Sequence, residues 1–541
     1  MNTKIFFMLL FFFPFSFIHL QAAEGSGPIE LLHDAFVLGE PLVIQGEPII
    51  ATGILSLFYQ SRNFEPAWSD LDYAKSIVAL LGSSDQEGLY PKDYHYIALT
   101  GLLKQLQVKG PQHARKLAEM DVLLTDGVLL YAAHLVNGKI SPARFEKTWN
   151  YNRVELLDED IVLALNTHVD NKTITSAFER LKPNLPVYRQ LRQGLSFFSD
   201  LTAKEEFVEI LADTVLKIGM EDTVVAQLRK RLQVLGFPAG NIHTTLFDDQ
   251  LEKSVQRFQQ RYGLEADGIV GQTTFNELNV PFSHRADQIR VNMDRIRWVV
   301  NDISPEFILV NIAGYRLWLG KNNEVTWSTD VMTGTISNQT PIFKSTMTYL
   351  VLNPTWTAPR SIIREMFPRF SQNPSYLTRN NYQLIGADGR RVDPESLNWD
   401  TLTQRSFPYT LVQMPGENNA LGRVKFMFPN QHAIYLHDTP HKSLFVKAQR
   451  AFSHGCIRVK DPLKFAELLL KGQDGWNRRT IDATVNSGKL TNISLKRPID
   501  VFLMYWTVQP DTEGRLGFVP DIYGRDLALI AALKRPITQS L

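Results

Sequence analysis

The segments YLHDTP, residues 435–440, and SHGCIRV, residues 453–459, decide both the fold and the chemistry of this chain. They contain Cys456, the only cysteine of the sequence, together with His454 beside it and His437 at the end of a predicted strand. A cysteine attacks a carbonyl as the thiolate, and it needs a base or a cation nearby because the free thiol is only slightly ionised at neutral pH. Gly455 permits close approach of the backbone, and the amides around Gly455 and Cys456 could form an oxyanion hole. The pattern predicts a nucleophilic cysteine with a histidine base.

These segments belong to a region that reads as short strands. Runs of β-branched and aromatic residues alternate with turn residues from about residue 305 onward, which predicts a β-rich core. The polar, irregular residues 361–409 predict an insertion that emerges from this core, either as a lid over the site or as a surface excursion. The predicted strands cover residues 307–312, 315–319, 325–332, 346–352, 424–428 and 433–436.

Three other interpretations of the cysteine and the histidines remain open. The residues that could bind zinc are His437, His441, His454 and Cys456. Pro440 keeps His437 and His441 from sharing a helix face, and the chain has no second cysteine and no HExxH-type motif to support a metal. The histidines could also be ordinary surface or core residues. A lone cysteine, finally, is commonly buried and inert.

The N-terminus has the composition of a secretory signal. Lys4 precedes an apolar run at residues 5–13, Pro14 interrupts the apolar region, and Ala22-Ala23 precedes polar residues. A basic end, an apolar centre and small residues at a cleavage site are typical of signal peptides. We expect residues 1–23 to direct export to the periplasm or cell envelope, with an uncleaved membrane anchor as the alternative. In an exported protein a leftover thiol is a candidate for reactivity.

Length and composition narrow the function classes. The chain has 541 residues, which is too long for one core and favours three or four domains. Its net charge is +1, so no strong field points toward nucleic acid or an anionic membrane. Residues 24–215 read mostly as helices and indicate a helical scaffold, whereas residues 282–304 indicate a linker helix. Residues 511–541 read as a C-terminal tail.

Residues 216–281 form a distinct unit of three predicted helices. Its Leu235-Gly236, Phe258-Gln259, Tyr262-Gly263-Leu264 and Asp267-Gly268 motifs resemble the peptidoglycan-binding domain family. The resemblance implies that this unit binds peptidoglycan. A spacer that keeps the three-helix fold and binds nothing is the alternative.

The segment SHGC with an upstream histidine and a following Arg458 resembles the signature of the YkuD-type L,D-transpeptidase catalytic domain. The similarity extends to Met332-Thr333-Gly334, to Thr340-Pro341, and to the runs NPTWTAP at residues 353–359 and NALGRVKF at residues 419–426. The large insertion and the helical N-terminal region resemble the long, multidomain YcbB-like members. The implied fold class is α+β multidomain: a helical scaffold, the three-helix unit, and a β-rich mixed-sheet catalytic domain over residues 305–510 with its insertion.

The resemblance also implies roles for individual residues. Cys456 would be the nucleophile and His437 its general base, with His454 shaping the site and Gly455 contributing to the oxyanion hole. The residues expected to face the donor or acceptor peptide are Arg458, Tyr435 and Trp356. Arg458 could instead brace its loop, Trp356 could merely pack, and Asp438, which follows the base, has no expected role in catalysis.

The implied function is formation of 3→3 cross-links in peptidoglycan through a cysteine thioester. A tetrapeptide stem would be the donor, and the side-chain amine of a diamino acid on a neighbouring stem would be the acceptor. The resemblance implies that carbapenems acylate the thiol. The implied reaction needs no cofactor and no metal. We expect stem peptides and glycan strands as partners, other cell-wall synthases as further candidates, no nucleic acid, and a monomer. The rivals are an L,D-carboxypeptidase or cysteine peptidase, attachment of a lipoprotein to the wall, and a non-catalytic wall-binding scaffold.

Overall fold

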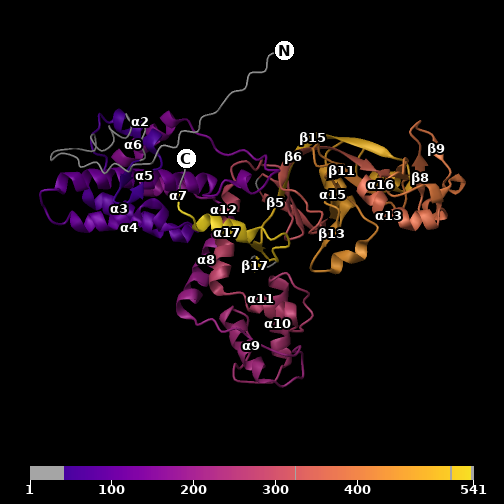
Figure 1. The fold of residues 1–541 in the computed structure, drawn as a ribbon, viewed down its shortest axis with the longest axis horizontal. Helices are drawn as coiled ribbons and strands as arrows, with labels where there is room; N and C mark the ends of the chain where they lie inside the picture. Colours follow the sequence, from indigo (N-terminus) through magenta and orange to yellow (C-terminus); the bar gives the residue numbers. More distant parts are fainter. Residues whose placement is uncertain (1–41, 323, 512–514, 538–541) are drawn as a thin grey trace, which may run out of the picture.

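The computed structural model describes residues 42–322, 324–511 and 515–537. Figure 1 shows an elongated body from which one small lobe projects. N-terminal helices form one end of the body, a β-rich region forms the other end, and the projecting lobe is helical. The α+β multidomain fold expected from the sequence is confirmed. The predicted signal peptide, residues 1–23, lies outside the described residues.

The N-terminal helices pack around α5 (His113–Asn137), which is buried on most of its faces. Asp121 of α5 accepts hydrogen bonds from Tyr59 Oη at 2.6 Å and from Trp68 N at 2.8 Å, which fixes the aromatic loop at residues 64–68 as a packing corner. Within the described residues, none of the helices combines the length and apolar character that a membrane span requires. The neighbouring elements are β1 (Val43–Ile44), β2 (Glu47–Pro48), α2 (Thr52–Ser61), α3 (Leu71–Gly82), α4 (Tyr96–Gln105), α6 (Asp158–Asp170), α7 (Ile174–Leu181) and α8 (Pro186–Lys204).

The projecting lobe is the predicted three-helix unit. Apolar side chains from all three of its helices, among them Leu228, Phe258 and Phe275, meet in one buried cluster. Asp248 caps the second helix, because its carboxylate accepts a hydrogen bond from Leu251 N at 2.9 Å. The helices are α9 (Thr223–Val234), α10 (Asp249–Arg261) and α11 (Gln272–Leu278).

The helix α12 (Phe282–Arg297) lies at the centre of the molecule, where the predicted linker helix was expected (Figure 1). It is buried along most of its length and packs against α8, α5 and α17 (Asp526–Lys534). Polar side chains on α12 find partners far away in sequence: Arg295 Nη1 bonds Asp526 Oδ1 at 2.6 Å, and Asn292 Nδ2 donates to Thr507 Oγ1 at 2.8 Å. The segment expected to be a linker is thus a core helix. Part of the segment expected to be a tail, α17, is core as well.

The β-rich region is a nine-stranded mixed sheet that closes on itself. Its strand order is β13-β5-β14-β12-β11-β6-β15-β3-β4, and β4 pairs back onto β5, so eight strands form a closed ring with β13 added at β5. Closure removes the sheet edges of these eight strands. The strands are β3 (Phe307–Asn311), β4 (Arg316–Lys321), β5 (Glu324–Gly334), β6 (Phe343–Leu352), β11 (Val424–Met427), β12 (Leu436–His437), β13 (Ala451–Ser453), β14 (Ile457–Val459) and β15 (Thr491–Met504).

The apolar core of this region joins the sheet to covering helices. Leu436 and Ile457, which are register partners in β12 and β14, are fully buried in it. Phe465 of α15 (Pro462–Leu469) stacks on Trp327 with ring centroids 5.6 Å apart, and α16 (Arg478–Asn486) packs beside α15. A small hairpin of β16 (Val508–Pro510) and β17 (Leu516–Phe518) connects the sheet to the helical centre.

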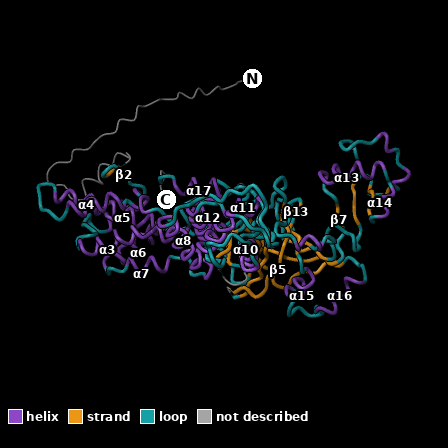
Figure 2. The backbone as a smooth tube through the Cα atoms, turned by 90° about the horizontal axis from the view of Figure 1, so that it is seen from below, coloured by secondary structure: helices purple, strands orange, loops and turns teal. Residues whose placement is uncertain are grey.

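The insertion is a folded subdomain with its own core. Its four-stranded antiparallel sheet has the order β7-β10-β8-β9, and aromatic side chains such as Phe370 and Phe407 fill the space between this sheet and α13. It occupies the far end of the molecule, beyond the closed sheet (Figure 2). Strands β7 and β10 lie outside the predicted limits of 361–409, so the unit is wider than the sequence indicates. Its elements are β7 (Trp356–Thr357), α13 (Arg360–Gln372), α14 (Ser375–Arg379), β8 (Tyr382–Ile385), β9 (Arg391–Val392) and β10 (Thr410–Gln413).

Candidate active site

The pairing of β12 with β14 brings the two decisive segments together. The strands are parallel, with Leu436 opposite Ile457 and His437 opposite Arg458. Successive side chains of a strand point to opposite faces, so with Leu436 and Ile457 in the core, His437 and Arg458 face the other way. Continuing the alternation, Tyr435 and Cys456 share the face of His437 and Arg458. The pairing of β12 with β14 therefore gathers these four side chains on one surface. They come from two segments that lie 21 positions apart in the sequence.

Cys456 is half-buried and makes its closest polar contacts with the segment before His437. Its Sγ donates to the carbonyl of Ala433 at 3.6 Å. Burial raises the pKa of the thiol, and this effect is opposed by hydrogen bonds from the Tyr435 backbone and hydroxyl and by the positive charges of Lys425 and Arg458. Within the described residues no hydrogen bond joins Sγ to His437. The sulfur atom in this structure is thus turned toward the Ala433 carbonyl.

His437 is buried and held in one tautomer. Its Nδ1 lies 2.5 Å from the carbonyl oxygen of Asp438, and because a carbonyl only accepts, we assign the proton to Nδ1. Nε2 is then left as an acceptor. Burial is the main cause that lowers the pKa of His437 to about 3, and the charges of Arg458, Lys425 and Lys442 act in the same direction. The imidazole is neutral at physiological pH, which is the form that can accept a proton.

Two cations flank His437 on this face. Lys425 on β11 is the register partner of His437, as Arg458 is on the other side. Lys425 Nζ lies over the ring of Tyr435, 3.9 Å from its centroid. Burial lowers the pKa of both cations, and the sequence interpretation did not include Lys425 among the site residues. Only the register of β11 against β12, a long-range pairing, reveals its position.

Gly455 sits in a tight turn that needs its conformation. Its φ of +110° lies in a region that residues with a Cβ rarely adopt. Ser453 Oγ donates to the Cys456 carbonyl at 2.5 Å and accepts from Gly455 N at 3.1 Å. Thr340, which is buried, donates to the Gly455 carbonyl at 2.8 Å. The Gly455 amide is thus engaged inside the turn. The Cys456 amide makes no hydrogen bond within the part of the chain that the structure describes.

His454 points away from His437 and toward the insertion. Its Nε2 lies 3.1 Å from Glu365 Oε2 on α13, and both side chains are exposed. The second histidine of the signature thus forms a contact between the loop of residues 453–456, which we call the nucleophile loop after the role expected for Cys456, and the subdomain. An exposed ion pair of this kind contributes little to stability, on the order of 0–1 kcal/mol.

Tyr435 and Trp356 form the second contact with the insertion. Tyr435 packs against the subdomain core, and a hydrogen bond with Trp356 acts on its hydroxyl. Trp356 is buried on β7, so most of its surface packs and little faces solvent. The Tyr435 hydroxyl also lies beside Cys456, and burial raises its pKa far above the ordinary value. Tyr435 is thus the side chain that touches both the thiol and the insertion.

Asp438 braces the turn that follows His437. Its carboxylate accepts hydrogen bonds from Arg423 N at 2.8 Å and from Thr439 N at 2.7 Å, and it pairs with the Lys442 ammonium. The charge of this buried carboxylate is therefore used by its own loop and by the backbone at Arg423. Among the described residues, no group of three or more His, Cys, Asp or Glu side chains is placed to hold a metal ion.

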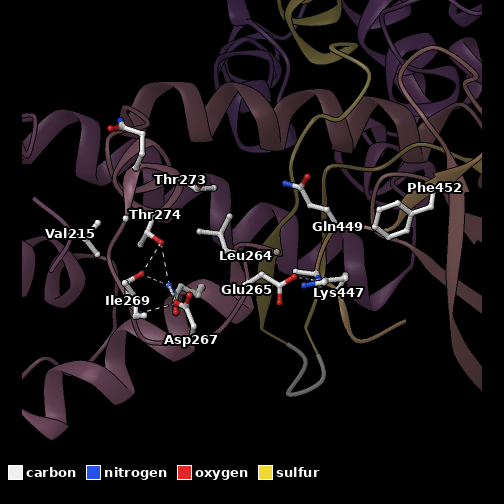
Figure 3. Close-up of a pocket in the computed structure, with 15 residues that line it drawn as sticks. Val215, Leu264, Glu265, Asp267, Ile269, Thr273, Thr274, Lys447, Gln449 and Phe452 are labelled. Atoms are coloured by element: carbon white, nitrogen blue, oxygen red, sulfur yellow. Dashed lines mark hydrogen bonds between the residues drawn. The ribbon is translucent and has the colours of Figure 1, made fainter. Parts of the chain in front are cut away.

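A groove of about 600 Å³ separates the three-helix lobe from the nucleophile loop (Figure 3). Leu264, Asp267 and Thr273 line it on the lobe side, and Lys447 and Phe452 line it on the other side. A hydrogen bond from Ala448 N to Glu265 Oε1 at 2.9 Å joins its two walls. Phe452 is four residues from Cys456, a chain distance of at most about 14 Å. The groove therefore ends close to Cys456.

The sequence comparisons agree with this division of the chain. Residues 305–482 match the family described as the L,D-transpeptidase catalytic domain. Residues 221–278 match the family described as "Putative peptidoglycan binding domain", and residues 54–195 match the one described as "Scaffold domain". A curated protein of Haemophilus influenzae (strain ATCC 51907 / DSM 11121 / KW20 / Rd), called "Putative L,D-transpeptidase", is 36% identical over 248 residues. The match covers 45% of this chain and 49% of that protein, so the chain spans about half the length of the relative it matches.

Solved structures with detectable likeness include two bacterial L,D-transpeptidases. One from Xylanimonas cellulosilytica DSM 15894 has 13% identity and a TM-score of 0.18, with 54% of this chain and 99% of that chain covered. One from Stackebrandtia nassauensis has 12% identity and a TM-score of 0.20, with 53% and 97% covered. Likenesses at this level carry no conclusion about the present fold.

Proposed function

This chain carries the catalytic domain of the L,D-transpeptidases together with a peptidoglycan-binding domain and a scaffold domain, and we propose that it cross-links peptidoglycan stem peptides through Cys456. The observation that carries the proposal is the common face of β12 and β14, which presents Cys456, His437 and Tyr435 together. The locked tautomer of His437 adds to it, because Nε2 is left free to take a proton.

In the first step His437 Nε2 removes the Cys456 proton. The thiol must first turn from Ala433 toward the imidazole, a change of side-chain rotamer. Sγ then attacks the carbonyl carbon before the terminal D-alanine of a tetrapeptide stem, and a C–S bond forms. As the intermediate collapses, the C–N bond breaks and the leaving amine takes the proton from His437. A thioester on Cys456 and free D-alanine result.

In the second step the side-chain amine of a neighbouring stem attacks the thioester. His437 takes a proton from that amine as the new C–N bond forms, and the thiolate leaves and is reprotonated. The product is a 3→3 cross-link, and the enzyme is restored without a cofactor or a metal. Tyr435 contacts both the thiol and the insertion, so we assign it to the peptide-binding surface. Trp356 supports it from within the insertion.

Oxyanion stabilisation falls mainly to the Cys456 amide. A free backbone N–H aimed at developing charge is worth about 10²–10³ in rate at comparable sites. The Gly455 amide is engaged by Ser453 Oγ in this structure, so it joins the oxyanion hole only if that hydrogen bond is exchanged. We assign Gly455 primarily to shaping the turn, and His454 to holding the nucleophile loop against α13.

Peptidoglycan is the partner that the three-helix domain favours. We propose that the glycan strand follows the groove between this domain and residues 447–452, with exposed Phe452 and the polar side chains around it contacting the sugars and the stem. Such a path would lead directly into the nucleophile loop. We further propose an exported, monomeric enzyme of the periplasm or cell envelope, in which residues 1–23 supply the export signal and other cell-wall synthases are candidate partners.

The test is a product analysis with purified disaccharide-tetrapeptide as both donor and acceptor. Liquid chromatography and mass spectrometry should show a dimer lighter than two monomers by one D-alanine. Cys456→Ala should form no dimer. Lys460→Met, which changes an exposed lysine directly after β14, should form the dimer at the wild-type rate. Release of D-alanine with only tripeptide as product would instead establish a carboxypeptidase. Absence of both products from folded protein would overturn the proposal.

A further inference from the structure

Three charged or titratable side chains form a row across the middle of the site face. The sheet places Lys425, His437 and Arg458 opposite one another on adjacent strands. Neighbouring strands lie about 4.8 Å apart, so the two cations emerge on either side of the imidazole. Cys456 lies two residues before Arg458 on the same face, about 7 Å along the strand. The row therefore borders the place where the attacked carbonyl must sit.

Neither cation of this row has a counter-charge. Within the described ranges, Lys425 and Arg458 take part in no ion pair, and Arg458 Nε is a buried donor that makes no hydrogen bond. The carboxylate nearest in sequence to His437, that of Asp438, is used by Arg423 N, Thr439 N and Lys442. A desolvated cation without a partner is costly, and natural structures keep one mainly where it binds something.

Two buried cations elsewhere in this chain, Lys139 and Arg295, do have such partners. Lys139 Nζ lies 2.6 Å from Asp93 Oδ2, and Arg295 Nη1 lies 2.6 Å from Asp526 Oδ1. These pairs brace the scaffold and the central helix. The contrast assigns the Lys425–Arg458 pair to an anion that arrives with the substrate.

We propose that Lys425 and Arg458 bind the terminal carboxylate of the donor stem, the carboxylate of the residue that leaves. This inference rests on the function proposed above and adds the group by which the donor is recognised. The carboxylate carbon is three bonds from the attacked carbonyl carbon, at most about 3.7 Å away. The Lys425 ammonium and the Arg458 guanidinium, on the two strands that flank β12, can reach a carboxylate at that distance from the thiol. The guanidinium of an arginine can donate to both oxygens of a carboxylate at once, and the ammonium of a lysine supplies a compact positive charge.

Carboxylate binding at this row sets the length of the donor. A stem ending one residue after the attacked carbonyl puts its terminal charge between Lys425 and Arg458, whereas a stem one residue longer moves that charge away by about 3.5 Å. Neutralising the two cations also favours the protonated imidazole that forms when His437 takes the thiol proton. The same contact thus selects the donor and assists the first step.

The test compares two donors that differ only in the terminal group: a tetrapeptide stem ending in D-alanine and the same stem ending in D-alaninamide. Release of D-alanine or D-alaninamide is measured with a fixed acceptor, and kcat/KM is obtained for each. The full-length wild type should prefer the acid by about 10–100-fold, the range expected for charge-assisted hydrogen bonds. The preference of each protein is the ratio of its kcat/KM on the acid to its kcat/KM on the amide. A change in thiol reactivity affects both values equally and so leaves the ratio unchanged.

Matched variants locate the preference. Lys425→Met and Arg458→Gln should each reduce the acid-to-amide ratio to near one, mainly through loss of activity on the acid. Arg458→Lys should keep part of the ratio because the charge remains. Lys460→Met removes a lysine that is exposed and paired with Asp330 at 3.1 Å, so its ratio should equal that of the wild type.

Two results would overturn the inference. One is equal turnover of acid and amide by the wild type, a measurement that depends on no variant. The other is a preference that survives in both folded variants, Lys425→Met and Arg458→Gln. Failure of the proposed function looks different: neither donor would release its terminal residue, while iodoacetamide would still alkylate Cys456. That result would end both proposals together.

Discussion

Buried charged side chains are paired at the centre of the molecule, around α12, and unpaired on the face of the sheet that carries Cys456 and His437. On α12 the polar side chains are paired, with Arg295 bonded to Asp526 and Asn292 to Thr507. On the face of β11, β12 and β14, Lys425 and Arg458 take part in no ion pair among the described residues, and His437 is kept neutral. Buried pairs fix how elements dock, whereas unpaired groups in a half-buried face are available to a substrate. The comparison separates charges that hold the fold from charges that act.

The largest effect is expected from Cys456→Ala. Loss of the nucleophile should reduce cross-link formation by at least about 10⁴-fold, because no other group here can form the acyl-enzyme. Thermal unfolding should stay within about 2 °C of the wild type, since the change removes a half-buried thiol whose hydrogen bond to the Ala433 carbonyl is long, at 3.6 Å. Cross-linking rates and a melting curve check both parts. A strong loss of stability would place Cys456 among the residues that hold the fold.

His437→Gln should have the second largest effect on activity. Glutamine can still donate to the Asp438 carbonyl but cannot accept the thiol proton, so acylation should slow by about 10²–10⁴-fold. His134 supplies the matched control, because it is also buried with a pKa lowered to about 3, but it bonds Tyr94 in the helical scaffold. His134→Gln should leave the acylation rate of folded protein unchanged. Equal losses in the two variants would contradict the role of His437.

The third prediction tests the comparison through stability. Arg295→Met leaves Asp526 buried without its cation and should destabilise the fold by about 3–5 kcal/mol. In a protein of this size, that corresponds to a melting temperature lower by about 3–4 °C. Arg458→Met strands no carboxylate, so its melting temperature should change by no more than about 2 °C while its activity falls. Calorimetry gives the melting temperature of both variants. If Arg458→Met lowers it as much as Arg295→Met does, Arg458 stabilises the fold and the comparison fails.

The smallest effect is expected in the pH dependence of stability. Because burial lowers the pKa of His437 in the folded protein from its ordinary 6.5 to about 3, the unfolded chain binds the extra proton between these values. The folded state therefore loses stability as pH falls from about 6.5 toward 3. His437→Gln removes this contribution, so its melting temperature relative to the wild type should rise by a few degrees between pH 7 and pH 4. A difference that is independent of pH would show that the imidazole is not buried neutral.

Sequence patterns identified the parts of this chain whose structure is local. The helices of the lobe follow from helical spacing and from the cap at Asp248, and the strands β3, β4, β5, β6, β11 and β12 of the closed sheet follow from their β-prone runs. The strands β14 and β15 were not predicted. The motif Thr340-Pro341 gains its physical meaning only in the structure, where Thr340 holds the Gly455 carbonyl. A local sequence pattern thus predicts a helix or a strand directly. A motif does not reveal which distant residue its side chain contacts.

Long-range pairing explains what the sequence did not reveal. The burial of α12 depends on partners such as Thr507 and Asp526, more than 200 residues away, so the sequence indicated only a linker helix over residues 282–304. The position of Lys425 depends on the register of β11 against β12. The fold of the insertion depends on β7 and β10, which pair across more than 50 residues. None of these contacts leaves a signal in local periodicity.

The most direct test of the central claim is intact-protein mass spectrometry of the mature enzyme after brief exposure to a tetrapeptide donor or a carbapenem. The account predicts a single covalent adduct on the wild type: the donor minus D-alanine in the first case, and the whole antibiotic in the second. The adduct should map to Cys456 and be absent from Cys456→Ala. Folded wild-type protein that carries no adduct with either reagent, or an adduct that persists in Cys456→Ala, would contradict it.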